Sequence, residues 1–366
     1  VRLWGKYSPN ADVDLNLRFV NEFRFYDTDH QDPDDWKPMT EITPDQIYVD
    51  IRNLADGMLD LRIGRQDLNY GNNLIFGDGT PLDGSRTAFH EAIKASLKFD
   101  RHTLDLLAMY AASEPALNIN DQDRKLVEQD EWALSAYGKY NRFEQTPFEY
   151  YWVFKHEDDS RTSYGSKADA DFHTFGARVM PKFGSGWEGN LEVALQTGEH
   201  GDEDVNGKML DAALTFSPDI WGGLKPKFSA GYWYLSGNEA GTSDNESWHP
   251  VFSRHPRFGE LQVLSYVGTQ YSVGGWSNLQ APFVGLDLSP LPKTRLILRY
   301  YKFYADEKDG LGSGDDRGDD FWALFVFNIT PELKGHLWAE WLNTGDYYPD
   351  GTEDGAFYRF NLEYSF

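Results

Sequence analysis

The residues best suited to chemistry in this sequence are arginines that stand at alternate positions among apolar residues. Arg62 lies between Leu61 and Ile63 in "LDLRIGRQD", and Arg295 and Arg299 share one parity in "TRLILRYY". In an extended strand, residues of equal parity point to one face, so such arginines would share a wall. A guanidinium offers paired donors that match a carboxylate. We therefore expect non-covalent attraction and orientation of anions.

The same parity rule supplies further residues for this wall. Acidic residues such as Asp50, Asp60 and Asp287 fall on the same face, so the wall is close to balanced in charge. Two interpretations stay open: arginines in a constriction that favours anions, or cross-strand ion pairs that only hold the wall in shape. The candidate wall residues are Arg18, Arg24, Arg52, Arg62, Lys94, Arg178, Arg295, Arg299 and Arg359.

Other kinds of chemistry find little support. The chain has no cysteine, which excludes disulfides and thiolate metal sites. His173 and His336 have no evident nucleophile beside them, so we expect no enzyme, although a barrel hydrolase is the enzymatic alternative. A formal net charge of −25 is a poor match for nucleic acid.

The face opposite the charged wall is apolar and rich in aromatic residues. The segment "AFYRFNLEYSF" places Tyr358, Phe360, Leu362, Tyr364 and Phe366 on one face and only polar residues on the other. Aromatic residues make up 16% of a chain of low mean hydropathy, −0.60. Such strands separate lipid from water, and rings at their ends would form interfacial girdles. The alternative, a soluble core, would need a less polar second wall.

The elements that carry both faces are strands. We count seventeen alternating segments and no convincing helical period, and short turns alternate with long acidic or glycine-rich loops. This predicts an all-β fold, an antiparallel transmembrane β-barrel formed by residues 1–366 as a single domain. Even parity predicts about eighteen strands, so one strand either lies upstream of Val1 or is overlooked in the count of seventeen. The long external loops are expected near 27–44, 72–86, 114–130, 238–279 and 305–319.

A barrel of this kind belongs in the outer membrane of a Gram-negative bacterium. The expected partners are outer-membrane lipid and lipopolysaccharide, with periplasmic or surface proteins as further partners. The barrel assembly machinery would recognise Tyr364 and Phe366 in the terminal aromatic row. We expect no cofactor, although acidic loops such as "DGLGSGDDRGDD" could gather calcium. The plainer interpretation of these loops is that they are solvated.

The loop from Gly237 to Leu279 is too long for a simple connector. It could fold into the mouth as a lid or constriction, or lie over the outer rim. Its two histidines lack a matched carboxylate spacing, so we do not expect a metal there. The residues proposed for a loop constriction are Trp248, His249, Arg254 and Arg257.

Two stretches resemble the alginate-export family of outer-membrane porins. Residues 59–92 contain a strand ending in Gly-Arg-Gln, followed by Leu, Tyr-Gly, a loop and an arginine before Phe; residues 257–307 contain Ser-Asn-Leu-Gln and a strand ending in Tyr-x-Lys-Phe. In the first stretch the matching residues are Gly64, Arg65, Gln66, Leu68, Tyr70, Gly71, Arg86 and Phe89.

This resemblance implies an eighteen-stranded barrel that passively transports an anionic poly- or oligosaccharide. It adds Arg65 and Arg86 to the pore candidates Arg62, Arg295 and Arg299. Arg65 departs from the parity of the wall, so either a bulge at Gly64 turns it inward or it binds a loop. The alternatives to an anion pathway are a general diffusion porin and a sealed barrel that anchors a surface assembly.

Overall fold

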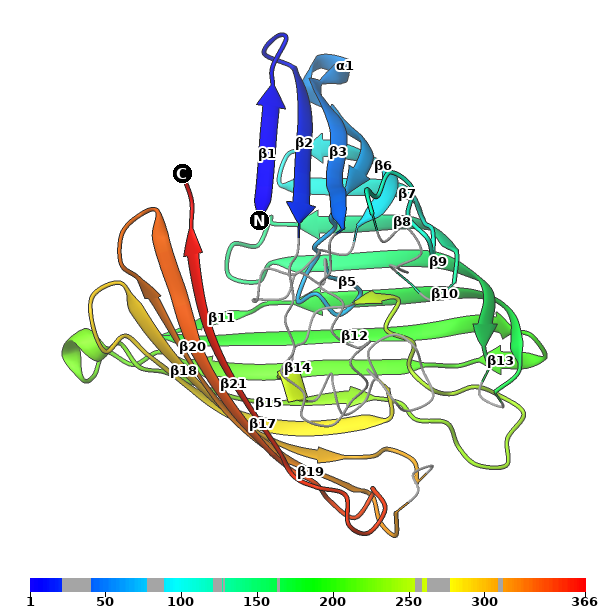
Figure 1. The fold of residues 1–366 in the computed structure, drawn as a ribbon, viewed down its shortest axis with the longest axis vertical. Helices are drawn as coiled ribbons and strands as arrows, with labels where there is room; N and C mark the ends of the chain where they lie inside the picture. The colour runs from blue at the N-terminus through cyan, green and yellow to red at the C-terminus, as the bar shows by residue number, and fades with distance from the viewer. Residues whose placement is uncertain are drawn as a thin grey trace.

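A single large sheet dominates the chain (Figure 1). The computed structural model describes residues 1–21, 41–77, 89–120, 127, 129–162, 165–253, 259–261, 277–308 and 312–366. The sheet has nineteen strands, and each long strand pairs antiparallel with the next long strand in chain order, from β1 with β2 to β20 with β21. The connectivity is therefore an up-and-down meander.

The strand bounds follow the alternating segments of the sequence closely. The long strands are β1 (Arg2–Tyr7), β2 (Val13–Asn21), β3 (Ile42–Asn53), β4 (Leu59–Gln66), β6 (His90–Phe99), β7 (His102–Ala111), β8 (Glu131–Tyr140), β9 (Phe148–Arg161), β10 (Lys167–Val179), β12 (Trp187–His200), β14 (Lys208–Phe216), β15 (Lys227–Leu235), β17 (Leu279–Leu288), β18 (Thr294–Tyr304), β19 (Asp316–Asn328), β20 (Leu333–Asn343) and β21 (Gly355–Tyr364). The short elements are α1 (Leu54–Gly57), β5 (Phe76–Gly77), β11 (Lys182–Gly184), β13 (Glu203–Val205), the 3-10 turn η2 (Gly222–Leu224) and β16 (Phe252–Ser253).

Setting aside the three-residue strands β11 and β13, the sheet contains the seventeen strands that alternation predicts. Two loop boundaries need correction, because β3 begins at Ile42 and β19 at Asp316, inside the loops expected near 27–44 and 305–319. Both strands extend beyond the alternating apolar residues into the expected loops, because a hydrogen-bond ladder pairs backbone peptide groups whatever their side chains are.

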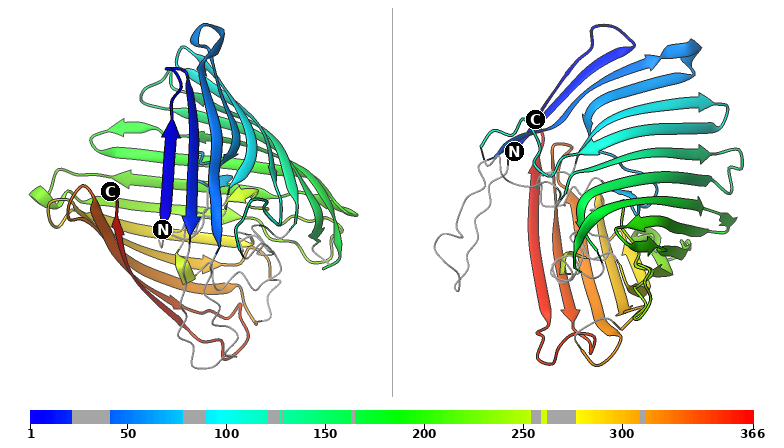
Figure 2. Two further views of the ribbon diagram at one scale, coloured as in Figure 1. Left: turned by 45° about the horizontal axis from the view of Figure 1, so that its top comes forward. Right: turned by 90° about the vertical axis from the view of Figure 1, so that its right-hand side faces the viewer.

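The two ends of the sheet, β1 and β21, run in the same direction (Figure 1). Within the described residues no hydrogen-bond ladder joins them. Figure 2 shows the sheet curving round so that these two strands approach each other. The additional strand expected upstream of Val1 lies outside the chain and stays a prediction.

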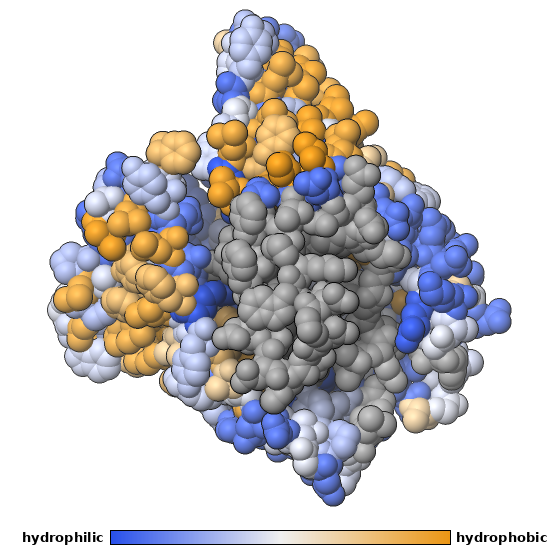
Figure 3. All heavy atoms as spheres, viewed as in Figure 1, coloured by the Kyte–Doolittle hydropathy of each residue, from blue (hydrophilic) through white to orange (hydrophobic). Residues whose placement is uncertain are grey.

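Period-two alternation explains why these segments are strands with two different faces. In β9, Tyr151 and Val153 are 3% and 0% exposed, whereas Tyr150 on the opposite face is 36% exposed. In β21, Phe360 and Tyr364 are both 66% exposed. Figure 3 shows apolar side chains gathered over β1 to β3 and over the last strands. No helix in the described part of the chain is long and apolar enough to cross a membrane.

The inner face of the sheet encloses parts of two long connections. Strand β5, between β4 and β6, pairs in parallel with β16, between β15 and β17. The rings of Phe76 and Phe252 stack with centroids 5.5 Å apart and are almost completely buried. They join a cluster that includes Tyr151, Val153 and other wall residues. The interior is therefore occupied by folded-in loop segments.

Candidate functional site

Arginines on the inner face of the first strands are paired with carboxylates. Arg62 binds Asp50 through Nε and Nη2, at 2.7 and 3.0 Å, and its guanidinium lies 4.1 Å from the centre of the Tyr48 ring. Arg18 binds Asp45 in the same two-fold manner, at 2.8 and 2.9 Å. These contacts are the cross-strand ion pairs of the second interpretation, because each guanidinium makes two hydrogen bonds to a carboxylate of the neighbouring strand.

A small polar hollow of 160 Å³ lies on the same wall near the short turns. Arg52 at its edge forms an ion pair with Asp14 at 2.6 Å, and Lys98 forms an ion pair with Asp60 at 2.7 Å. Lys94 lies in the same hollow, where the nearby carboxylates of Asp105 and Asp50 oppose the positive charge of its ammonium group. The hollow is lined by Asp50, Arg52, Asp60, Leu61, Arg62, Lys94 and Ser96.

Two further predicted arginines hold the folded-in segments. Arg178 on β10 donates to the side-chain oxygen of Asn72 at 2.6 Å, and it also lies 3.3 Å from Glu149. Arg359 on β21 donates to Glu260 at 2.8 Å. Both side chains reach the lumen as predicted by parity, but their contacts connect wall to loop.

Arg65 lies on the outward-facing phase and not in the lumen. Its Nε donates to Glu91 at 2.6 Å and its other nitrogens to the carbonyl oxygens of Pro44 and Ala116. The ladder between β3 and β4 runs without a register shift, so no bulge turns Arg65 inward. Of the two alternatives for this residue, the structure has the one in which it binds a loop.

The glycine before Arg65 is required by the backbone. Gly64 has φ +123°, and a Cβ at this position would lie 2.3 Å from the carbonyl oxygen of Ile47. Only a residue without a side chain allows β3 and β4 to approach here. The Gly-Arg-Gln motif is therefore a structural element, in which glycine permits the pairing and arginine fixes the neighbouring segment.

An excess of positive charge occurs on the inner face of β15, β17 and β18. Arg295 and Arg299 both bind the carboxylate of Asp287, Arg299 at 2.6 Å. Lys227 stands directly opposite Asp287 in the ladder, so it shares this face. The Arg295 side chain is 55% exposed. We call Lys227, Asp287, Arg295 and Arg299 the basic cluster; it has three cations and one anion.

Small residues give the basic cluster its shape. Gly285 pairs with Arg299 across the ladder, and a Cβ on Gly285 would meet Arg299 Nη1 at 2.7 Å and Ser229 Oγ at 2.5 Å. The missing side chain lets Arg299 lie across the strand and reach Asp287. The position of this charge is therefore fixed by the wall.

The connection after β15 is bound to the wall by buried charges. Lys155 is fully buried, and its Nζ lies 2.7 Å from Glu131, 2.6 Å from Glu157 and 2.7 Å from the carbonyl oxygen of Val251. Its ammonium group also lies 4.5 Å from the centre of the Phe252 ring. A buried ammonium group needs close carboxylate partners, because an unpaired charge in the interior would have an uncompensated cost of desolvation.

Trp248 and His249 lie in this same connection, against the inner face of the wall. Trp248 is 2% exposed. His249 Nε2 lies 3.2 Å from Glu157, and its Nδ1 accepts from the N–H of Val251 at 2.9 Å. Burial lowers the pKa of His249 below its ordinary value of 6.5, and nearby Glu157 opposes that shift. The segment thus folds inward, as a constriction requires, and not over the rim.

The other motif residues also serve this inward folding. Tyr70 is buried and donates to Asp105 at 2.8 Å, and Gln66 donates to the carbonyl oxygen of Ala92. In the second motif, Asn278 accepts from the N–H of Glu307 at 2.7 Å. Both resemblance motifs thus mark places where loops join strands.

Several predicted residues lie outside the described part of the chain: Arg24, Arg86, Arg254 and Arg257. In the ranges that the structure describes, no group of three or more histidine or acidic side chains could hold a metal. The expectation of no cofactor, with calcium at the acidic loops as the alternative, stays a prediction.

Sequence reasoning missed two parts of this interior. Lys227 was not among the candidates, although its parity with Trp233 on β15 would have placed it on the inner wall. The cluster around Lys155 was missed because two of its partners, Glu131 on β8 and Val251 in a distant connection, come near it only in the folded chain, although Glu157 is on the same strand. The contacts of both lysines depend on strand register and on where loops lie, and a local sequence pattern predicts neither.

The family to which the chain is similar agrees with the predicted β-barrel fold. A family model described as alginate export matches residues 9–318. None of the curated proteins compared matches the chain.

Solved structures from Pseudomonas aeruginosa share the fold at low identity. OpdK, solved with vanillate, has a TM-score of 0.64 at 12% identity and covers 99% of this chain and 90% of that chain. OccK10 (OpdN) has a TM-score of 0.60 at 10% identity, with coverage of 100% and 92%. OccK3 (OpdO) has a TM-score of 0.56 at 12% identity, with coverage of 96% and 84%. These likenesses confirm the predicted porin-type barrel fold.

Proposed function

Since the chain belongs to the alginate export family and has the fold of outer-membrane porins, we propose that it is a passive pore for anionic solutes, including acidic poly- or oligosaccharides. Its membrane is the outer membrane of a Gram-negative bacterium. The family is named after alginate and OpdK was solved with vanillate, and both compounds carry carboxylates. A guanidinium-bearing wall suits that chemistry.

The observation that carries the proposal is the excess of positive charge in the basic cluster. Arg18, Arg52 and Arg62 are each matched by a carboxylate, whereas Arg295 and Arg299 share Asp287 and Lys227 stands beside them. Charges are screened over about 8 Å in physiological salt. The acidic external loops therefore influence the pathway less than cations on its wall do, despite the net charge of −25.

Ion selectivity of single channels tests this proposal. In a salt gradient, we expect the reversal potential of the wild-type pore to show that it prefers anions over cations. The double variant Arg295→Gln and Arg299→Gln should shift that potential toward cations, because it removes two of the three cations around Asp287 and leaves only Lys227 opposite it. A matched control, Asp50→Asn with Arg62→Gln, removes a paired set and should leave selectivity nearly unchanged. A cation-selective wild-type pore would contradict the proposal.

The chemical class of the transported solute can be tested by measuring how polymers block the channel current. Soluble polyuronate should reduce anion current through the wild-type pore, and the Arg295→Gln, Arg299→Gln variant should be less sensitive. Neutral dextran of similar size is the control, and equal block by both polymers would point to a general diffusion porin.

The sealed-barrel alternative rests on one observation, the filled interior. Phe76 and Phe252 stack inside the sheet with 0% and 1% exposure. A pore blocked by these segments would show no unitary current under any salt gradient. Any resolved unitary conductance excludes the sealed barrel.

A further inference from the structure

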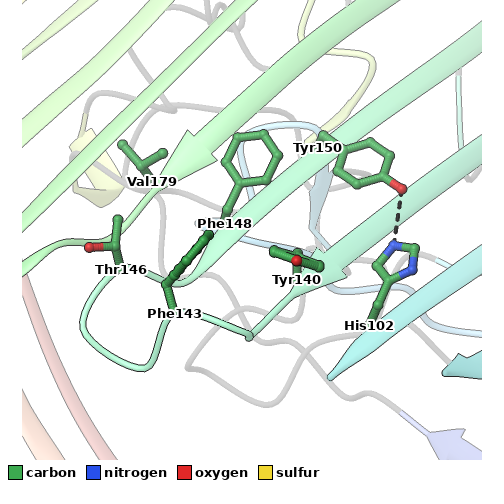
Figure 4. A pocket seen from close by; sticks show the side chains of 7 residues that line it. All are labelled: His102, Tyr140, Phe143, Thr146, Phe148, Tyr150 and Val179. Atoms are coloured by element: carbon green, nitrogen blue, oxygen red, sulfur yellow. Dashed lines mark hydrogen bonds between the residues drawn. The ribbon is translucent and has the colours of Figure 1, made fainter. Parts of the chain in front are cut away.

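The outward face of the sheet contains an apolar hollow of 580 Å³ at the short-turn end of β7, β8, β9 and β10 (Figure 4). It lies on the face opposite the lumen, because Tyr150 belongs to the exposed phase of β9 while Tyr151 is buried inside. The side chains that the argument uses are His102, Tyr140, Phe143, Phe148, Tyr150 and Val179.

The hollow is held open by a fixed tyrosine. Tyr150 lies over Gly138 of the neighbouring strand, where a Cβ would approach its ring to 2.2 Å. The Tyr150 hydroxyl is 3.0 Å from His102 Nε2, as Figure 4 shows. The ring therefore lies along the sheet and does not fill the space between Tyr140 and Phe148. A preformed apolar hollow of this kind suits a flexible hydrocarbon chain.

Cations border the hollow on its short-turn side. Arg101 directly precedes His102, and its Nη1 lies 3.5 Å from the carbonyl oxygen of Arg142 in the next turn. Lys182 is beside the same turn, because its N–H donates to the carbonyl oxygen of Gln145 at 2.7 Å. Asp100 and Glu144 stand on these turns as well. The border thus carries both signs, with cations in excess.

We propose that this hollow binds a glycerophospholipid of the leaflet on the short-turn side. One acyl chain occupies the aromatic hollow, and the phosphate binds Arg101 and Arg142. Aromatic side chains gather at the level of lipid headgroups, and arginines near a membrane surface attract anionic lipid. The acidic residues on the turns suit the ammonium of an ethanolamine headgroup. The inference concerns the outer face and is independent of the cargo of the pore.

A second apolar hollow supplies the matched control. It has a volume of 430 Å³ and lies over β18 to β21, with Ala339 and Phe360 among its lining residues. The short turns near it carry Lys293 and Glu332 and no arginine. Arg359 also lines this hollow, but its guanidinium donates to His336 and Glu260. Hydrocarbon can cover this surface, but the turns offer no comparable pair of guanidinium groups for a phosphate.

Native mass spectrometry of the delipidated, folded barrel in detergent tests the proposal. Titration with dioleoyl phosphatidylethanolamine should give one tightly retained lipid per chain. The variant Arg101→Gln with Arg142→Gln should bind roughly tenfold more weakly, since each lost cation near the membrane surface weakens attraction for phosphate. Val179→Trp should abolish retention by filling the hollow, whereas Ala339→Trp should retain lipid as the wild type does.

Dioleoylglycerol separates specific binding from general coverage by hydrocarbon. This neutral probe has the same chains but no phosphate, and we expect it to be retained far less than the phospholipid. Equal retention of both probes, or of phospholipid by all variants, would overturn the proposal. Retention of a co-purifying protein in place of lipid would do the same. Heat-modifiable migration checks folding, and the arginine variant on exposed turns decides the matter even if Val179→Trp does not fold.

Discussion

Lys155 on strand β9 donates a hydrogen bond to the carbonyl oxygen of Val251, 2.7 Å away, and so fastens a folded-in loop to the wall. The ammonium group is fully buried between Glu131 and Glu157. A single side chain thus compensates two buried carboxylates and holds a segment of the interior. This contact is one of several that hold the segment in the interior, together with the bonds between Gln196 and the backbone of His249.

Replacing Lys155 with methionine should release the loop and destabilise the barrel. Two carboxylates would remain buried without their cation, a change that costs about 3–5 kcal/mol. We expect larger and noisier unitary currents and earlier loss of the folded band on heating. Lys98→Met is the control, because Lys98 contacts Asp60 on the wall and no loop. Unchanged current and heat resistance in Lys155→Met would show that the loop is held by other contacts.

Acidification should weaken the same attachment through His249. Its Nδ1 accepts a hydrogen bond from the N–H of Val251, so protonation at Nδ1 breaks that bond. Because burial lowers the pKa of His249, the attached loop binds protons less readily than the released loop. The stability of the attached state is complete above the ordinary value of 6.5, and it falls from there to the lowered pKa.

The pH effect can be measured as open-channel noise between about pH 7 and about pH 5. Noise should rise on acidification in the wild type and less so in His249→Gln, which cannot be protonated in this range. Identical pH profiles in the two proteins would assign the effect to other groups.

Gly64→Ala should greatly reduce the yield of folded barrel. Alanine at φ +123° costs about 1–3 kcal/mol in backbone strain, and its Cβ would also collide with the Ile47 carbonyl oxygen. The measurement is the heat-modifiable fraction after refolding. Gly5→Ala serves as control, since nothing lies within 4 Å of a Cβ there. Equal yields for both variants would refute the structural assignment of the Gly-Arg-Gln motif.

Gly285→Ala should alter selectivity without changing any charge. The new methyl group would displace Arg299 from Asp287, because it occupies the space through which the guanidinium passes. We expect a normally folded pore with a reversal potential shifted from the wild-type value. The matched comparison is Gly5→Ala, which should keep the wild-type potential.

The strands were predictable because a chain between lipid and a polar interior has a different environment on each face. The count of seventeen alternating segments agrees with the seventeen long strands of the sheet. Parity also placed Arg62, Arg178, Arg295, Arg299 and Arg359 on the inner face. These features depend only on residues within one strand.

Partner identity was not predictable, because it depends on register and on loops. Arg62 finds Asp50 across a hairpin, while Arg178 finds Asn72 on a distant connection. The apolar run of Leu74, Ile75 and Phe76 could have covered the rim as well as the interior. Only its pairing with β16 decides between the two.

The connection between β15 and β17 also sets a limit on distance. Ser253 donates to the carbonyl oxygen of Asn73, within the segments held by Lys155, whereas Glu260 is bound to Arg359 on β21. Seven residues in full extension reach at most about 25 Å. Strand number normally determines the bore of a barrel. Here the number of residues between Ser253 and Glu260 also limits how far Asn73 and Arg359 can lie from each other, so the length of a connection, and not only the strand number, constrains the interior.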